Sequence, residues 1–364
     1  MTIGVLIFLP LIFYLWLTFG WFSAIKTRVN IKKNQQPVSI SVVVPFRNEG
    51  QQTAALLEQL EHQVYDVTIQ WEVIFVNDYS EDKGEEHLAE QIKRASIDVK
   101  LIHAKEKGKK AAQHLGIGQA TGQHILTLDA DVHIGEKWLQ SMVDVHLTNE
   151  ALYTAGPVLP TEGKGWWSRL VALEFLSLQA STEGSFHRSQ PFMSNGANSI
   201  FEVDAWREAE VIRHDAGLAS GDDVFLLHAL HALGKKTAHA SHIDAAVYTD
   251  LPLTFKALMN QRSRWAAKTS HYKSRFAQAI AIAVFLLALF QLFGWMISFY
   301  LWGIVWLTKT IADMAIVKRM AAKYHLKAKT IDVLVLALIY PIYITMVVAM
   351  TLLQVPQPPN KHWK

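Results

Sequence analysis

The sequence predicts an α/β protein with a mostly parallel sheet, helices on both faces of that sheet, and transmembrane helices at both ends of the chain. Apolar and β-branched segments alternate four times with helical patterns between residues 38 and 128, which is typical of a parallel sheet. Long uncharged runs lie on either side of the polar middle region. The hydrophobic content of 51% and the mean hydropathy of +0.13 are high for a soluble protein.

The first uncharged run covers residues 3–25, which is long enough for a helix to cross a hydrocarbon core of roughly 30 Å. No basic residue precedes the run, which favours a membrane helix over residues 1–25 rather than a cleaved signal peptide. The positive-inside rule then predicts that the region after this helix is cytoplasmic. The basic residues that follow the run are Lys26, Arg28, Lys32 and Lys33.

The strands expected in the polar middle region each end in polar residues. In sheets of this kind, ligands bind at the carboxyl ends of the strands, so these polar side chains are expected to converge on one site. The expected strands are 38–45, 71–76, 99–103 and 125–128, and the helices between them end near residues 63, 96 and 120. The polar residues expected to converge are Asn48, Asp78, Lys109 and Asp131.

The fourth strand runs directly into Asp129-Ala130-Asp131. Buried strands do not normally end in two carboxylates one residue apart unless the oxygens have a partner. Mg²⁺ and Mn²⁺ prefer oxygen ligands and often bind one or two carboxylates together with substrate phosphates. The alternative is a solvated turn, because Asp is a good turn residue. Turn chemistry also explains Asp78, and a solvated charge run explains the lysines before Lys109.

Further polar features occur in the second half of the middle region. A strand is expected over 153–159, an apolar helix over 165–181 and a tight loop over 194–199. Asp222 and Asp223 stand at the start of a helical pattern, where they either cap the helix or supply a catalytic base. Neighbouring helical residues diverge by about 100°, so one of these two acids at most faces a cleft.

The C-terminal part of the chain contains the remaining apolar segments. Residues 276–308 are uncharged and predict a transmembrane hairpin broken near Gly294, and 331–353 predict a last span, which makes four spans and leaves 356–364 outside. Gln261, Arg264 and Trp265 precede the hairpin. Arg264 offers a fork for phosphate oxygens and Trp265 a flat face for a ring, although a juxtamembrane anchor also suits these residues.

Composition limits the other possibilities. The chain has no cysteine, which excludes disulfides, thiolate metal sites and a cysteine nucleophile. The formal net charge is only +3, and the basic residues lie beside the apolar segments rather than along a stripe. We therefore expect no nucleic-acid partner.

With these residues in place, the chain resembles the membrane-bound family 2 glycosyltransferases, such as cellulose, chitin and hyaluronan synthases and ceramide glucosyltransferase. The resemblance covers residues 38–265 and implies a GT-A nucleotide-sugar domain. Its elements arrive in the order of the family. They are Pro45, Arg47, Asn48, Glu49, Asp78, Lys109, Asp129, Asp131, Asp222, Asp223, Gln261, Arg264 and Trp265.

The resemblance implies a role for each of these residues. Asp78 would hold the nucleoside, and Asp131 with Asp129 would bind Mg²⁺ or Mn²⁺ and the ribose-phosphate region. Asp223 would be the general base, with Asp222 as the other candidate. The residues near the first strand and the lysine would contact the donor: Pro45, Arg47, Asn48, Glu49 and Lys109. The residues expected to close over the diphosphate and acceptor are Gln261, Arg264, Trp265 and, by a weaker match, Asn198.

The leading hypothesis is an inverting glycosyltransferase of the inner cell membrane. Its donor is expected to be a nucleotide-diphosphate sugar, most simply a UDP-sugar, and its acceptor a lipid or lipid-linked glycan at the cytoplasmic face. A processive polysaccharide synthase is the alternative in the same chemistry, although four spans are few for a polymer channel. A catalytically silent membrane scaffold is the alternative of another class.

Overall fold

The computed structural model describes residues 2–26, 32–215, 218 and 221–353, and only the backbone of residues 2–7. The chain divides into two compact units. The helical unit comprises Met1–Arg28, Glu162–Met193 and Leu251–Gln357, and the α/β unit comprises Val29–Thr161, Ser194–Asp250 and Pro358–Lys364. The predicted limits of the domain over 38–265 stay a prediction. Arg28 and the predicted outer tail 356–364 lie outside the described residues.

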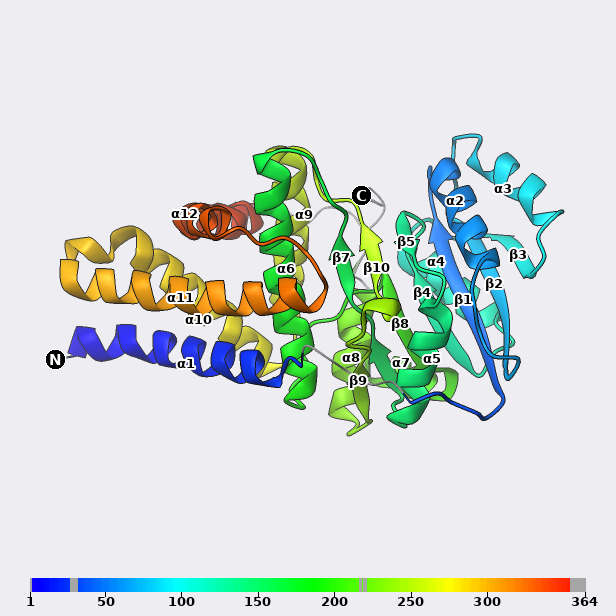
Figure 1. The fold of residues 1–364 in the computed structure, drawn as a ribbon, viewed down its shortest axis with the longest axis horizontal. Helices are drawn as coiled ribbons and strands as arrows, with labels where there is room; N and C mark the ends of the chain where they lie inside the picture. The colour runs from blue at the N-terminus through cyan, green and yellow to red at the C-terminus, as the bar shows by residue number, and fades with distance from the viewer. Residues whose placement is uncertain (1, 27–31, 216–217, 219–220, 354–364) are drawn as a thin grey trace. The chain divides into compact units, whose positions relative to one another are not determined.

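The main sheet of the α/β unit has the strand order β3-β2-β1-β4-β8-β6-β9 in the described part of the chain (Figure 1). The first four of these strands are parallel, as predicted, whereas β8 is antiparallel to both of its neighbours. The carboxyl ends of β1, β2 and β4 therefore lie at one edge. The strands are β1 Val38–Phe46, β2 Ile69–Asn77, β3 Asp98–His103, β4 His124–Leu128, β6 Tyr153–Ala155, β8 Asn198–Glu202 and β9 Thr237–His239.

The helices of this unit begin near the strand ends. α4 packs against β1 and β2, and Gly116 lets it approach the side chains of Val43 and Val76 closely. The helix predicted to end near residue 96 ends earlier, and the Ser96 N–H donates to Glu61 Oε1 at 2.7 Å instead. The helices are α2 Gly50–Glu61, α3 Gly84–Ile92, α4 Lys109–Gln119, α5 Trp138–Thr148, α7 Val203–Ile212 and α8 Asp222–Ala232.

A second, three-stranded sheet has the order β5-β10-β7, formed by Val132–Ile134, Val247–Thr249 and Val158–Pro160. The prediction of a single strand over 153–159 was wrong. Gly156 and Pro157 separate β6 from β7, and because proline has no N–H to donate, the two strands join different sheets. The predicted loop over 194–199 is also shorter than expected, since β8 begins at Asn198.

The helical unit contains three described helices that are long and apolar enough to cross a membrane. They cover Arg275–Met296, Phe299–Lys323 and Thr330–Leu353, whereas Phe8–Ala24 is a shorter apolar helix, so the fourth span stays a prediction. The elements are α1 Thr2–Ala24, α6 Trp166–His187, α9 Phe255–Thr269, α10 Arg275–Phe293, α11 Phe299–Lys323 and α12 Thr330–Leu353.

The predicted break near Gly294 is present, because α10 ends at Phe293 and a short 3-10 turn follows. The predicted end of the uncharged run at residue 308 does not end the helix, since α11 continues to Lys323. Lys309 is buried within α11, and its Nζ donates to Asp313 Oδ2 at 2.6 Å one turn later. The paired charges explain why the helix continues through an ionisable residue.

Candidate active site

The loops after β1 and β2 are tied to each other by hydrogen bonds. Asn48 has a positive φ of 54°, its side-chain oxygen accepts from the Glu81 N–H at 2.7 Å, and its own N–H donates to Ser80 Oγ at 3.0 Å. Asn48 therefore fixes the shape of the two strand-end loops. Among the other residues near the first strand that are predicted to bind the donor, Pro45 and Glu49 are buried, and Arg47 is half-buried.

Asp78, at the end of β2, is completely buried. Its two carboxylate oxygens accept the Gly108 N–H at 2.9 and 3.0 Å. Burial raises the pKa of Asp78, although this hydrogen bond and the charges of Arg47 and Lys107 oppose the rise. Gly108 has a φ of 134°, which favours glycine, and it precedes the first residue of α4. Asp78 thus holds the start of the helix that carries Lys109.

Lys109 brings three of the predicted acidic residues together. Its ammonium donates to Asp129 Oδ1. Burial alone would lower the pKa of Lys109, but the charges of Asp129, Asp131 and Asp223 outweigh that effect and raise it. Three carboxylates, two from the turn between β4 and β5 and one from α8, therefore act on one ammonium group. Of the four residues expected to converge, Lys109 and Asp131 interact here, Asp78 binds the neighbouring Gly108, and Asn48 lies in the loops after β1 and β2.

Asp223 is half-buried in the first turn of α8. Its Oδ2 accepts the Gly196 N–H at 2.8 Å, and a Cβ at Gly196 would lie 3.4 Å from the Asp223 Cβ, so the loop before β8 runs close beside this acid. The nearby Tyr153 hydroxyl bonds to Ser194 Oγ, and burial with the added charge of Asp223 raises the Tyr153 pKa. The carboxylate of Asp223 is held at one oxygen by a backbone donor.

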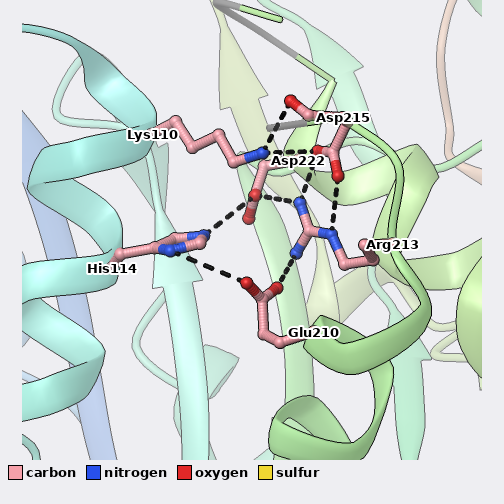
Figure 2. A network of polar contacts seen from close by, with 6 residues as sticks. All are labelled: Lys110, His114, Glu210, Arg213, Asp215 and Asp222. Carbon is pink, nitrogen blue, oxygen red and sulfur yellow. Dashed lines mark hydrogen bonds and ion pairs between the residues drawn. The ribbon is translucent and has the colours of Figure 1, made fainter. Parts of the chain in front are cut away.

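Asp222 belongs to a separate network of ion pairs, which Figure 2 shows. Its Oδ1 accepts from Arg213 and lies 3.3 Å from His114 Nε2. Burial alone would raise the pKa of Asp222, but the His114 hydrogen bond and the Arg213 charge lower it to about 2. The two adjacent acids therefore have different partners. The network consists of Lys110, His114, Glu210, Arg213, Asp215 and Asp222.

Arg213 is the centre of this network and was not predicted from the sequence. Its side chain is 3% exposed and pairs with Asp215, Asp222 and Glu210. Lys110 reaches Asp215 Oδ2 at 2.7 Å from the same helical turn that carries Lys109. The spacing of Arg213 in the sequence gives no indication of its partners. The sequence feature that relates to this network is the lysine run over 105–110, which includes Lys110.

Asn198 is completely buried at the start of β8. Its Nδ2 donates to the carbonyl oxygens of Pro157 and Ala245, both at 2.9 Å, and its Oδ1 accepts from Trp138 Nε1 at 3.0 Å. These three bonds use both donors of the amide and one lone pair of its oxygen within the α/β unit. The arrangement does not support the expected contact of Asn198 with the acceptor, and we leave it out of the proposed site.

Gln261, Arg264 and Trp265 lie on α9, in the helical unit. All three are partly exposed, whereas Arg262 between them is buried. Arg262 donates to the side-chain oxygen of Gln261, and its guanidinium lies 4.3 Å from the centre of the Trp265 ring. The roles expected for Gln261, Arg264 and Trp265 stay predictions.

Asp129 and Asp131 are the candidate ligands for a divalent metal. No group of three or more His, Cys, Asp or Glu residues suited to a metal occurs among the residues that the structure describes. Asp129 and Asp131 are half-buried carboxylates one residue apart, and the Lys109 ammonium already bonds to Asp129. Two carboxylates fit a Mg²⁺ or Mn²⁺ ion whose coordination is completed by substrate phosphates.

Comparison with known proteins adds relatives to this geometry. The chain is 30% identical over 109 residues to dodecaprenyl-phosphate galacturonate synthase of Rhizobium johnstonii, a match that covers 30% of this chain and 32% of that protein. It is 27% identical over 131 residues to undecaprenyl-phosphate 4-deoxy-4-formamido-L-arabinose transferase of Serratia proteamaculans, covering 36% and 40%. The matches thus span between a third and two fifths of these relatives.

The fold and the family are clearer. A mannosyltransferase from Pyrobaculum calidifontis, solved with GDP-Man and Mn²⁺, superimposes with a TM-score of 0.58 over 97% of each chain at 15% identity, which shows a shared GT-A fold. The model of glycosyl transferase family 2 matches residues 41–203, and that of glycosyl transferase family group 2 matches 124–353, more than half of the chain. The chain therefore belongs to the family 2 glycosyltransferases and is an enzyme of that class.

Proposed function

We propose that the protein is an inverting, metal-dependent glycosyltransferase that moves one sugar from a nucleoside-diphosphate sugar to a hydroxyl of a lipid or lipid-linked acceptor. The observation that carries the proposal is the ion pair between Lys109 and Asp129, together with the charges of Asp131 and Asp223, which raise the pKa of the same ammonium. Positive charge and carboxylates at one strand edge suit a ligand that combines a diphosphate with a metal. The lipid part rests on the two lipid-phosphate transferases that the chain resembles.

The donor side of the site follows from the strand-end loops. We assign the nucleoside to the loops that Asp78 and Asn48 hold in place, with Pro45, Arg47 and Glu49 beside them. Lys109 meets the diphosphate as a point charge, because an ammonium on a flexible stem can leave Asp129 for a phosphate oxygen. A UDP-sugar is the first donor to test, and GDP-mannose is the second because the structural neighbour binds it.

Asp131 with Asp129 would hold the metal, Mg²⁺ or Mn²⁺. When bound, the metal would stabilise the negative charge that develops on the β-phosphate of the leaving nucleoside diphosphate. Lys109 adds positive charge on the same side. Arg264, from the Gln261-x-x-Arg264-Trp265 motif, is assigned to the diphosphate and Trp265 to the acceptor, and these two assignments rest on the sequence motif.

Asp223 is the proposed general base. Its carboxylate takes the proton of the acceptor hydroxyl while that oxygen attacks the anomeric carbon and the bond to the diphosphate breaks, which inverts the configuration. The Gly196 N–H donates to Oδ2 of Asp223, and we assign the proton to Oδ1. Asp222 is unsuited to this step, because its pKa of about 2 makes it a weak base and its Oδ1 is held by Arg213 and His114.

We assign the protein to the inner membrane, with its α/β unit facing the cytoplasm. Three apolar helices of sufficient length support membrane insertion. The cytoplasmic orientation rests on the basic residues that follow the first apolar segment, by the positive-inside rule. Activated sugars are made in the cytoplasm, and this orientation would give the site access to them.

The test is transfer by the purified protein in detergent. The protein is incubated with a panel of UDP- and GDP-sugars, Mg²⁺ or Mn²⁺, and a polyprenyl phosphate or a membrane lipid extract, and the products are separated by size. A single added sugar that requires the metal supports the proposal. A ladder of products would instead indicate a processive synthase. Neither binding nor hydrolysis of any donor would favour the silent scaffold.

A further inference from the structure

Arg262 is a buried cation in the middle of the motif on α9, and it contacts two of the three residues to which the motif assigns chemistry. Its Nη1 donates to Gln261 Oε1, and its guanidinium stacks over Trp265 at 4.3 Å. Its side chain is only 5% exposed. Because its guanidinium is buried, Arg262 can act on the diphosphate only through neighbouring residues. Its role in the motif is therefore not direct contact with the substrate.

Two other nitrogens of Arg262, Nε and Nη2, donate to a glutamate of α6. Arg262 Nε lies 3.1 and 3.2 Å from the two oxygens of Glu174, and Nη2 lies 2.6 Å from Oε2. The Tyr343 hydroxyl of α12 donates to Glu174 Oε1 at 3.2 Å. Burial alone would lower the pKa of Arg262, but the charge of Glu174 raises it, so the guanidinium stays charged. Arg262 thus connects α9 to α6 and to an apolar helix, all within the helical unit.

A second buried pair on α6 has the same chemistry without the motif. Glu183 accepts from Lys323 of α11, and its Oε2 accepts from the Tyr324 hydroxyl at 2.9 Å. Each glutamate therefore binds a basic side chain and a tyrosine hydroxyl. For Glu174 they come from α9 and α12, and for Glu183 from the last residue of α11 and the residue after it. Glu183 Oε1 also lies 3.5 Å from His187 Nε2. The two glutamates differ in that only the Glu174 pair includes a residue that touches Gln261 and Trp265.

We propose that Arg262, held by Glu174 and Tyr343, is a positioning residue that fixes the rotation of α9 and so aims Gln261, Arg264 and Trp265. The proposal rests on the proposed function, which gives those three residues their roles. The geometry of a helix explains how one anchor can act on all of them. Successive residues rotate by about 100°, so an anchor at Arg262 sets Arg264 about 200° away, on the opposite side of α9.

The experiment compares two double variants, each of which replaces a whole buried pair by apolar residues. Removing both partners of a buried ion pair is often neutral for stability, whereas removing one leaves an unpaired charge. The test variant is Glu174→Met with Arg262→Met, and the matched control is Glu183→Met with Lys323→Met. Each leaves one tyrosine hydroxyl without its glutamate. Thermal midpoints and size-exclusion profiles give the folded fraction, and sugar transfer is measured per folded protein.

We expect both double variants to fold, the control to keep wild-type transfer, and the test variant to lose kcat by about 100-fold, as misaimed catalytic groups typically do. Donor KM should stay near the wild-type value, because a transition-state contact is lost. The single variant Arg262→Lys keeps the positive charge but not the forked guanidinium. Its kcat should lie between those of the test double variant and the wild type.

Transfer at the wild-type rate by both double variants would overturn the positioning role while leaving the proposed function intact. An equal loss in both would also overturn it, because the loss would then follow from removing any buried pair of α6. If the wild-type protein transfers no sugar, the proposed function fails first. Arg264→Ala separates the remaining case: unchanged transfer in that variant would remove the roles assigned to the motif itself.

Discussion

Substitution of Asp222 by asparagine should lower stability and leave the chemistry of transfer intact. The carboxylate is held by Arg213 and His114, which lower its pKa from 3.8 to about 2. A pKa lowered by that amount corresponds to about 2 kcal/mol of folding free energy at neutral pH. The loss should stay near this value of about 2 kcal/mol. It should not reach the roughly 3 to 5 kcal/mol that is typical of a buried charge left without a partner, because Arg213 keeps Glu210 and Asp215 as partners.

The pH dependence of this loss has a definite direction. Because the folded-state pKa of Asp222 lies below its ordinary value, the carboxylate stabilises the protein above about pH 4, and this contribution disappears as the pH falls through about 2. The difference in stability between wild type and Asp222→Asn should therefore be full at pH 7 and shrink below about pH 4.

Thermal unfolding in detergent, followed by circular dichroism at pH 7 and at lower pH, measures the effect. A loss of about 2 kcal/mol corresponds to a midpoint lower by about 4 to 8 °C for a unit of this size. Asp204→Asn is a matched control, because Asp204 forms an exposed pair with Arg207 and its substitution should leave the midpoint unchanged. The reasoning would be refuted if Asp222→Asn kept its midpoint but lost transfer, since Asp222 would then be the base.

Three further substitutions test other residues of the site. Asp223→Asn should keep the thermal midpoint but reduce kcat by about 10²- to 10⁴-fold in a transfer assay, and near-normal kcat would remove it as the base. Lys109→Met should raise the donor KM by roughly tenfold in initial-rate measurements, as expected when a charged contact worth about 1.4 kcal/mol is lost, and an unchanged KM would argue against a phosphate contact. Asn198→Leu should lower the unfolding free energy by about 3 kcal/mol, because three buried hydrogen bonds are lost, and loss of transfer at full stability would restore it to the acceptor site.

The first half of the α/β unit could be predicted from the sequence because its signals are local. The parallel strands are rich in apolar and β-branched residues, and each is followed by polar residues whose meeting point follows from the sheet topology. The residues expected to meet in this way were Asn48, Asp78, Lys109 and Asp131, and their roles stay predictions. The second half has three-residue strands, such as β6 and β7, which are too short to show a periodicity, and their assignment to two sheets depends on Gly156 and Pro157.

The partners of the site residues could not be predicted for a different reason. Arg213 and Asp222 are nine residues apart, but the Lys110 and His114 side chains that complete their network come from a helix about a hundred residues earlier. Pairing of this kind depends on tertiary packing and leaves no spacing in the sequence. The same holds for Arg262 and Glu174, and for the fully bonded Asn198, whose polar side chain suggested a ligand contact.

The most direct test of the proposed chemistry is a single comparison of sugar transfer by wild type and Asp223→Asn. Both purified proteins are given a labelled nucleotide sugar, the divalent metal and a lipid acceptor, and the glycolipid product is quantified and its anomeric configuration determined. The account predicts one added sugar with inverted configuration from wild type and almost none from Asp223→Asn. Equal product from the two proteins, or retained configuration, would contradict it.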